Sequence, residues 1–155
     1  MQRVQWWRKL FGRRKPAPLE RERTDLVVVA SGFDDVESCS AALDRAAASE
    51  PAWIPDAETV VRHHLLLPTD RVSWAVEVAA QDDYTVAPSD APAAEVAAVG
   101  DEGLVALVLQ RTQILDALHC SQERSRMAGL AQRGGGHVLG WDALQPPRNR
   151  VADTD

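Results

Sequence analysis

The sequence predicts an α+β protein built on an antiparallel sheet, for three reasons. Short runs rich in β-branched residues alternate with stretches whose apolar residues recur at helical spacing. Gly, Pro and Asp residues separate these runs, as expected at turns and helix ends. The chain has 155 residues, 45% of them hydrophobic, which is enough for one core of ordinary size. We therefore expect a single domain at 25–145, after a tail and linker at 1–24 and before a disordered tail at 146–155.

A strand and a helix open the domain. LVVVASGF (26–33) is a β-branched run that ends near a glycine, which predicts a buried strand. A helix is expected over 35–48, capped by Asp34 or Asp35, because Glu37 completes a pattern like a capping box. The sequence leaves open whether this first strand pairs with the main sheet. The inward stripe of the helix is expected to consist of Val36, Cys39, Ser40, Leu43, Ala46 and Ala47.

The next strand and helix follow after a loop. TVVRHHLLLP (59–68) predicts a strand that Pro68 closes. Thr69 or Asp70 then caps a helix over 70–81. Its small alanines allow close approach to a sheet, and the residues expected to face inward are Val72, Ala75, Val76, Ala79 and Ala80.

Three strands and a helix complete the domain. DYTVAP (83–88) alternates as a short strand, and 89–103 predicts a loop. GLVALVLQRTQ (103–113) is the most apolar strand and is expected at the centre of the sheet. A helix follows at 114–133 and a last strand at 136–144. The inward residues of that helix are expected to be Ala117, Cys120, Met127, Leu130 and Ala131.

The order of these elements predicts a particular arrangement. Residues 59–144 run strand, helix, strand, strand, helix, strand, which is the order of the ferredoxin-like βαββαβ plait. In that fold an antiparallel four-stranded sheet carries two helices on one face. The unit at 26–48 precedes it as an extra strand and helix.

Three glycines at 134–136 separate the last helix from the last strand. Phosphate-binding glycine loops run from a strand into a helix, so that the N–H groups at the start of the helix meet the anion. Here the order is reversed, and the negative end of the helix faces the glycines. Gly134 or Gly135 is therefore expected to take the left-handed conformation that ends a helix, with Arg133 favourably placed near the dipole.

Charge is distributed unevenly along the chain. The first 15 residues carry six basic and no acidic side chains, whereas the rest has 11 basic and 23 acidic residues, a net charge of −12. We expect no direct nucleic-acid binding by this acidic body, because phosphate neutralisation needs a basic face. A basic protein segment is the partner that an acidic body favours.

The basic segment at 1–15 can form a short amphipathic helix. Its apolar residues share one face among arginines and lysines, which is typical of segments that lie on an anionic membrane surface. An inert tail, or a contact with nucleic acid or protein, is the alternative. Because the chain shows no apolar run of membrane-spanning length and no secretory leader, we expect a cytoplasmic protein, held by this tail at the inner face of the membrane. The residues expected to contact the membrane are Val4, Trp6, Trp7, Arg8, Lys9, Leu10 and Phe11.

The residue patterns predict no catalytic, cofactor-binding or metal-binding residues. His63 and His64 are adjacent, so their rings point to opposite faces of a strand and cannot both bind one metal. One ring is expected beneath the helices and the other facing outward. Cys39 and Cys120 lie far apart without a CxxC pair, and we expect both to be reduced. No zinc-ligand spacing and no GxSxG elbow is present.

Three segments together resemble one protein family. RHHLLLP at 62–68, DYTV at 83–86 and LAQRGGGHVLGWDAL at 130–144 are similar to the regulator of ribonuclease E activity B family, the RraB-like domains. The resemblance covers about residues 58–145. It implies an acidic ferredoxin-like protein without catalytic residues, so the matching positions are markers of the fold. These markers are His63, His64, Tyr84, Gly140 and Trp141.

The resemblance also implies a function. Members of the family bind the endoribonuclease that initiates RNA decay, and they inhibit it or change the composition of the degradation complex. Our main hypothesis is therefore a non-catalytic protein-binding regulator, and the alternative is a ferredoxin-like domain that senses a small molecule or self-associates. In two places the chain departs from the family pattern: a basic tail and a strand–helix unit replace an acidic helical N-terminal segment, and Asp83 stands where a glycine is expected. The partner's identity, the sign of regulation and the oligomeric state stay open.

Overall fold

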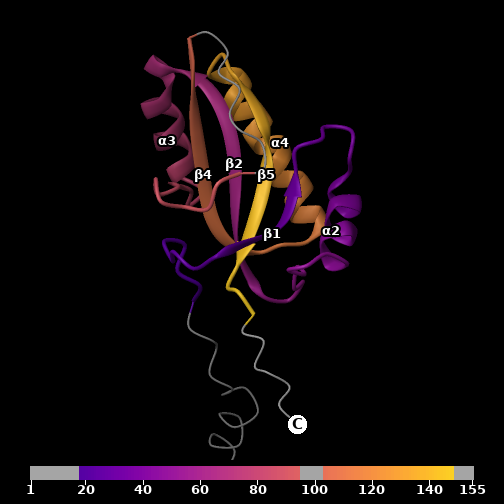
Figure 1. Cartoon of the computed structure of the whole chain (residues 1–155). Coiled ribbons are helices and arrows are strands. Elements are labelled where there is room, and N and C mark those ends of the chain that lie inside the picture. Colours follow the sequence, from indigo (N-terminus) through magenta and orange to yellow (C-terminus); the bar gives the residue numbers. More distant parts are fainter. Residues whose placement is uncertain (1–17, 95–102, 149–155) are drawn as a thin grey trace, which may run out of the picture.

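The computed structural model describes residues 18–94 and 103–148. In these ranges a five-stranded antiparallel sheet carries three α-helices and a short 3-10 turn, which confirms the predicted α+β class (Figure 1). The strands are β1 (Val27–Gly32), β2 (Glu58–Pro68), β3 (Thr85–Val86), β4 (Leu104–Ile114) and β5 (His137–Gln145). The helical elements are α2 (Cys39–Ala47), η1 (Thr69–Arg71), α3 (Val72–Ala80) and α4 (Ala117–Arg133).

Strand β2 lies at the centre of the sheet. The strand order is β1-β5-β2-β4-β3, so β2 pairs with β4 along its whole length and with β5 over most of it. Nine consecutive residues of β2 are buried, because both faces of the strand are covered. The sequence predicts the most apolar strand, β4, at this position, but β4 lies one place further out. Along its outer edge it pairs with the two residues of β3 and accepts a hydrogen bond from the N–H of Ala87, and part of the strand stays exposed.

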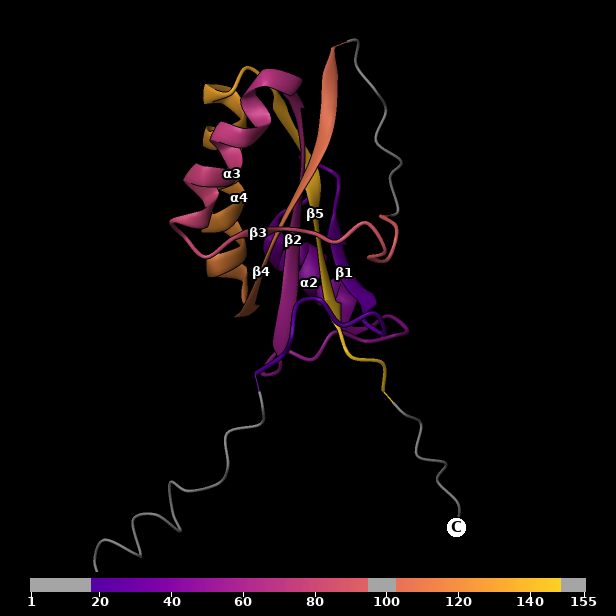
Figure 2. The same ribbon diagram turned by 90° about the vertical axis from the view of Figure 1, so that its left-hand side faces the viewer.

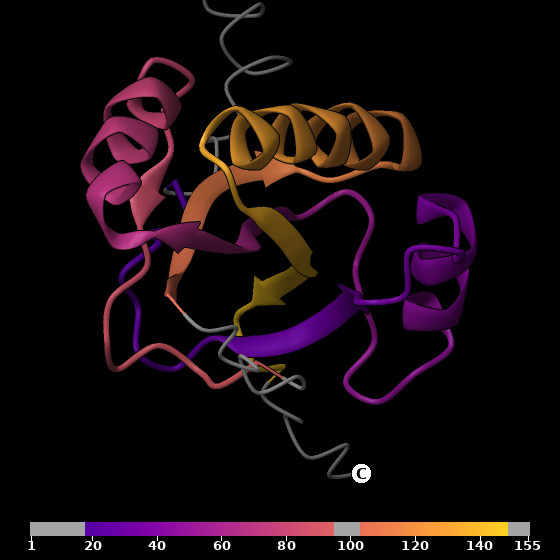
Figure 3. The same cartoon turned by 90° about the horizontal axis from the view of Figure 1, so that it is seen from above.

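The first strand joins the edge of this sheet, a placement that the sequence leaves open. β1 lies antiparallel to β5, with Val27 opposite Gln145 and Gly32 opposite Trp141. Helix α2 packs against β1 and α4, and Figure 3 shows this arrangement from above. The strand–helix unit at 26–48 is therefore continuous with the sheet and core of the rest of the chain.

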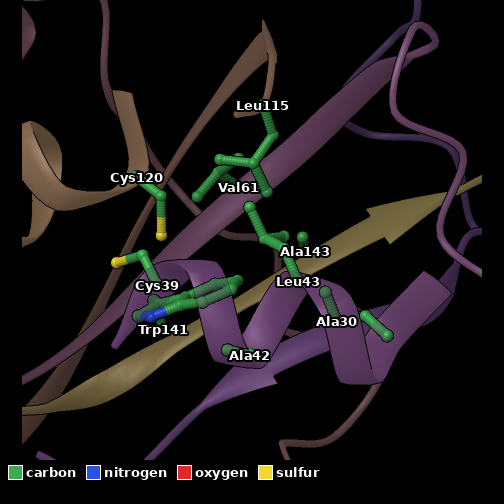
Figure 4. Packing of buried hydrophobic residues seen from close by; sticks show 10 residues of the cluster. Ala30, Cys39, Ala42, Leu43, Val61, Leu115, Cys120, Trp141 and Ala143 are labelled. Carbon is green, nitrogen blue, oxygen red and sulfur yellow. The ribbon is translucent and has the colours of Figure 1, made fainter. Parts of the chain in front are cut away.

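Two clusters of buried side chains lie between the sheet and the helices. The first lies beneath α3 and α4, which cover the same face of the sheet in Figure 2. It includes Leu65, Leu67, Ala75, Ala79, Met127 and Leu130. The second cluster, drawn in Figure 4, joins α2 to the strands and to α4, and it consists of Ala30, Cys39, Ala42, Leu43, Ala46, Val61, Leu115, Cys120, Trp141 and Ala143.

The two cysteines lie next to one another inside the second cluster. Figure 4 shows Cys39 on α2 next to Cys120 on α4, with the sulfur atom of Cys120 directed toward Cys39. Both thiols are free and buried. Burial, together with the contact to Cys39, raises the pKa of the Cys120 thiol. At neutral pH the Cys120 thiol therefore stays protonated, and the two cysteines pack as small, weakly polar side chains.

Residues 18–26 cover part of the second face of the sheet. Leu19 and Leu26 pack in a small apolar cluster on β2 and β5. The N–H of Leu19 also donates a hydrogen bond to the carboxylate of Glu58 over 2.6 Å. The sequence assigns this stretch to a linker up to Thr24, yet these contacts make it part of the packing of the domain.

Helix α2 begins later than the sequence predicts. The side chain of Asp34 accepts a hydrogen bond from the N–H of Val36, which forms a turn and leaves Val36 92% exposed. The hydroxyl of Ser38 caps the helix instead. Glu37 completes no capping box, because it pairs with an arginine of the same helix. The predicted helix at 35–48 is therefore wrong at its start, where a closer hydroxyl competes for the free N–H groups.

The other two helices also differ at their N-terminal ends. The predicted helix at 70–81 divides into η1 and α3, and neither has a side-chain cap. Ala80, expected to face inward, is exposed because it lies on the same outer face of the helix as Ser73 and Glu77. The predicted helix at 114–133 begins three residues later, where the carboxylate of Asp116 accepts a hydrogen bond from a first-turn N–H.

The predicted strand at 83–88 is reduced to the two residues of β3. Asp83 has a φ of 65°, the left-handed region that favours glycine. The turn brings the Tyr84 side chain into the core, where it is 1% exposed. The residues after β3 cross to the second face of the sheet, as Figure 2 shows.

Several predictions concern residues that the structure does not describe. The residues expected to contact a membrane, 4–11, lie outside the described ranges, as do 149–155 of the predicted C-terminal tail. Among the residues that are described, no helix combines the length and apolarity needed to cross a membrane.

The glycines after α4 form the predicted helix end. Gly135 takes the left-handed conformation with a φ of 81°, while Gly134 keeps a φ of −80°. The N–H of Gly136 donates to the carbonyl of Ala131 over 2.9 Å and closes the last turn. A Cβ atom at Gly136 would lie 1.9 Å from the carbonyl oxygen of Leu66, so this position has no room for a side chain.

Gly136→Ala is expected to destabilise the fold by about 3 kcal/mol, at the upper end for overpacking, because the added methyl group meets the backbone of β2. Gly129→Ala is the matched control. Gly129 lies in α4 with open space around it, and alanine there is expected to stabilise by about 0.5–1 kcal/mol. Urea unfolding measures both changes. A Gly136→Ala variant as stable as the wild type would contradict the close approach.

Candidate functional site

The five marker residues meet where β2 pairs with β5. His63 lies opposite Trp141 in this register, and His64 lies opposite Gly140. Tyr84 approaches from the turn before β3, with its ring centroid 5.7 Å from that of His63. His63 lies on the helix face of the sheet and His64 on the second face, as strand alternation predicts. The site therefore has two sides that share one pair of strands.

His63 is enclosed on the helix face. It is 1% exposed, and neither ring nitrogen has a hydrogen-bond partner among the described residues. Burial lowers the pKa of His63 to about 4, so the ring is neutral at pH 7. The ring borders a hollow of about 350 Å³ between α4 and β5, whose other lining residues include Asp35, Arg124, Gln132 and His137.

A buried carboxylate next to His63 joins three elements. The Tyr84 hydroxyl donates to Glu123 of α4 over 2.5 Å, and Arg111 of β4 lies 3.2 Å from the other carboxylate oxygen. The Arg111 guanidinium also stacks on the Tyr84 ring, 4.5 Å from its centroid. Burial and the hydrogen bond to Glu123 raise the pKa of Tyr84, so its hydroxyl stays protonated. These contacts connect the β3 turn to β4 and α4.

His64 does not face solvent, contrary to the prediction. It is 8% exposed because Phe33 and the residues after β3 cover this face. The Phe33 ring centroid lies 5.4 Å from that of His64. Nε2 of His64 is 3.1 Å from Oδ1 of Asp142, although the two groups are not aligned for a hydrogen bond.

Arg62 and Asp142 form a buried ion pair beside His64. Nε and Nη2 of Arg62 donate to the two carboxylate oxygens over 2.6 and 2.5 Å, and the side chains are 3% and 0% exposed. Nη1 donates to the backbone carbonyl of Pro92 over 2.5 Å. Burial alone would raise the pKa of Asp142, but the contacts with His64 and Arg62 outweigh it and lower that pKa. The carboxylate therefore stays ionised at neutral pH.

Gly140 and Trp141 lie where β1 and β5 approach each other closely. Gly140 has a φ of 155°, and a Cβ atom there would lie 2.4 Å from the Phe33 ring. Trp141 lies against Gly32, where a Cβ atom would be 2.3 Å from the indole nitrogen. Glycine is required at both contacts because a side chain would collide with a ring. The GW pair is thus explained by packing between the first and last strands.

Four charged residues of this site were not predicted from the sequence. Arg62 and Asp142 stand within apolar strand segments, and Glu123 falls on the same helix stripe as Cys120 and Met127. A charged residue within an apolar segment, or on the inward stripe of a helix, indicates a buried ion pair. The sequence does not show which residue is the partner, because the strands that pair are far apart along the chain. The four residues are Arg62, Arg111, Glu123 and Asp142.

The charged groups of the site contact one another. Within the described ranges, no group of three or more His, Cys, Asp or Glu side chains is placed to hold a metal ion. The chain matches no family model, no curated protein and no solved structure.

His63 is expected to make the fold less stable in mild acid. A histidine in the unfolded chain has a pKa near 6.5, whereas that of His63 is about 4, so the unfolded state binds the proton first as the pH falls. The stability that the neutral His63 ring contributes to the fold is complete above the pKa of histidine in the unfolded chain. It is lost between about pH 6.5 and 4, a loss of about 3 kcal/mol in the free energy of unfolding.

Urea unfolding of the wild type, His63→Leu and the control His119→Gln at about pH 7 and about pH 4.5 measures this effect. His63→Leu should lack this part of the pH dependence, whereas His119→Gln, which changes an exposed ring, should keep it. Equal pH dependence in the wild type and His63→Leu would show that His63 is not held neutral.

Proposed function

We propose that this protein is a non-catalytic, protein-binding regulator of RNA decay, similar to the RraB-like inhibitors or modulators of ribonuclease E. The acidic body binds a basic, arginine-rich segment of a ribonuclease, and the N-terminal tail holds the protein at the inner face of the membrane. The sequence resemblance at 58–145 supplies the family. The excess of negative charge on the surface is the structural observation that carries the proposal.

The negative charge on the surface is in excess because most arginines of the described part of the chain form ion pairs within it. In the described ranges seven of them pair with carboxylates of the same chain, namely Arg21, Arg23, Arg45, Arg62, Arg111, Arg124 and Arg126. Many exposed carboxylates have no ion-pair partner among the described residues, including Asp44, Glu50, Asp56, Asp70, Glu77 and Asp90. A surface with unpaired carboxylates and neutralised arginines attracts a basic segment.

The fold that we propose for residues 58–145 is the one that the RraB-like resemblance implies. Residues 58–145 adopt the ferredoxin-like plait, with β1 and α2 added at the edge of β5. The strand order β5-β2-β4-β3 and the position of α3 and α4 on one face support this assignment.

Burial of the marker residues favours binding over catalysis. His63, Tyr84 and Trp141 are at most 1% exposed. The nearby carboxylates of Glu123 and Asp142 are paired with arginines. A general base or nucleophile must reach its substrate, whereas these side chains are buried and the two carboxylates are paired with arginines. The surface that meets a partner is therefore formed by other, exposed residues.

The tagged full-length chain is expected to capture the ribonuclease from lysate at low salt and, more weakly, at moderate salt, because screening weakens contacts between exposed charges. Immunoblotting for the ribonuclease measures the recovery. Absence of the ribonuclease under both conditions would overturn the proposal.

Removal of four exposed negative charges tests whether the acidic surface attracts the basic segment of the ribonuclease. The variant Asp44→Asn, Glu50→Gln, Asp70→Asn and Glu77→Gln should lower recovery at low salt roughly three-fold or more. The control Gln81→Asn and Gln132→Asn changes exposed side chains without changing charge and should recover the wild-type amount. Equal capture by the two variants would show that surface charge does not select the partner.

The tail is expected to hold the protein on anionic membranes. The intact chain should sediment partly with vesicles that contain phosphatidylglycerol, and deletion of residues 1–15 should leave the protein in the supernatant. The double variant Trp6→Ala and Trp7→Ala keeps the charge of the tail but removes apolar area, so its binding should be intermediate. Equal sedimentation of the intact and deleted chains would refute the tether.

A further inference from the structure

A cavity of about 500 Å³ lies on the second face of the sheet, between β2, β4 and the residues that follow β3. Its volume is in the range of small-molecule sites, roughly 300–1,000 Å³. Arg62 and His64 are the polar side chains at its sheet side. The apolar lining residues that matter here are Val86, Ala87, Pro88, Ala106, Val108 and Leu139.

The segment over the cavity is attached to the sheet at two points. The N–H of Ala87 donates to the carbonyl of Val108 over 2.9 Å, and Arg62 donates to the carbonyl of Pro92 over 2.5 Å. Pro88 and Pro92 restrict the backbone between and at these points. A segment fixed in this way cannot easily collapse onto the sheet, so the space beneath it is formed before a ligand arrives.

The Arg62–Asp142 ion pair at the polar side of the cavity carries no net charge. Asp142 neutralises Arg62 through two hydrogen bonds. A guanidinium has five N–H groups, and the contacts to Asp142 and Pro92 use three of them. The other two N–H groups have no acceptor among the described residues, and most of the cavity lining around them is apolar. An anionic ligand would add an unbalanced negative charge next to Asp142, and a cation would lie against Arg62.

The geometry points to a binding site for a small, uncharged, mainly apolar molecule that carries one hydrogen-bond acceptor, such as an amide or ketone. The acceptor faces Arg62, and the apolar part lies against the walls formed by β4 and the segment after β3. This site goes beyond the proposed protein-binding function and does not depend on it, because the exposed carboxylates described above do not line the cavity.

Three probes of equal chain length separate the charge requirement from the apolar contact. Hexanamide, hexanoate and hexylammonium are titrated into the full-length chain and followed by amide chemical shifts in NMR spectra. Hexanamide should give saturable shifts at His64, Ala87 and Val108 and bind about ten-fold more tightly than either ion. No saturable shift with hexanamide, or tighter binding of an ion, would overturn the proposal.

Filling the cavity tests its location. Ala106→Trp places a large side chain in the cavity and should weaken hexanamide binding about ten-fold or more. Val105→Trp is the matched control, because Val105 is the neighbouring residue on the opposite face of β4 and is also partly exposed. Thermal unfolding checks that both variants are folded, and Val86→Trp replaces Ala106→Trp if the latter is not. Unchanged affinity in the folded cavity-filling variant would exclude this site.

Discussion

The register between β2 and β5 is the constraint on which the rest of the structure depends. It places Arg62 opposite Asp142, His63 opposite Trp141 and His64 opposite Gly140. A slip of one residue would turn each strand's inward side chains to the other face. It would also separate two charges that are almost completely buried, and an unpaired buried charge is strongly destabilising. The ion pair therefore selects one register, even though a buried pair adds little net stability in itself.

This register gives the two faces of the sheet different roles. On the helix face, His63 and Tyr84 lie beside the Glu123–Arg111 pair, and their contacts join the β3 turn, β4 and α4. On the second face, the Arg62–Asp142 pair borders the cavity beneath the segment after β3. One face is thus covered by helices, whose contacts hold the fold together. The other borders the cavity of about 500 Å³, while the exposed carboxylates around both faces give the surface its negative charge.

The extent to which the structure could be predicted differs between elements. Long apolar periodic segments such as β2 and α4 were identified close to their true positions, because burial of a face imposes the same pattern wherever the segment packs. Helix ends were less accurate: Asp34 accepts from the N–H of Val36 in a separate turn, and Ser38 caps α2 at the N–H of Ala41. The burial of His64 was missed because the segment that covers it is distant in sequence. The pairing partners of Arg62 and Glu123 were missed for the same reason.

By itself, the sequence determined the α+β class, the alternation of the two histidines, the left-handed glycine after α4 and the negative charge of the body. These properties depend on local periodicity, backbone preference and composition. Only the tertiary structure decided that β1 pairs with β5, that both histidines are buried, and that Arg62 meets Asp142 beside a cavity. Such features depend on contacts between residues that are distant along the chain, and their energies become favourable only when the strands and the segments that cover them come together.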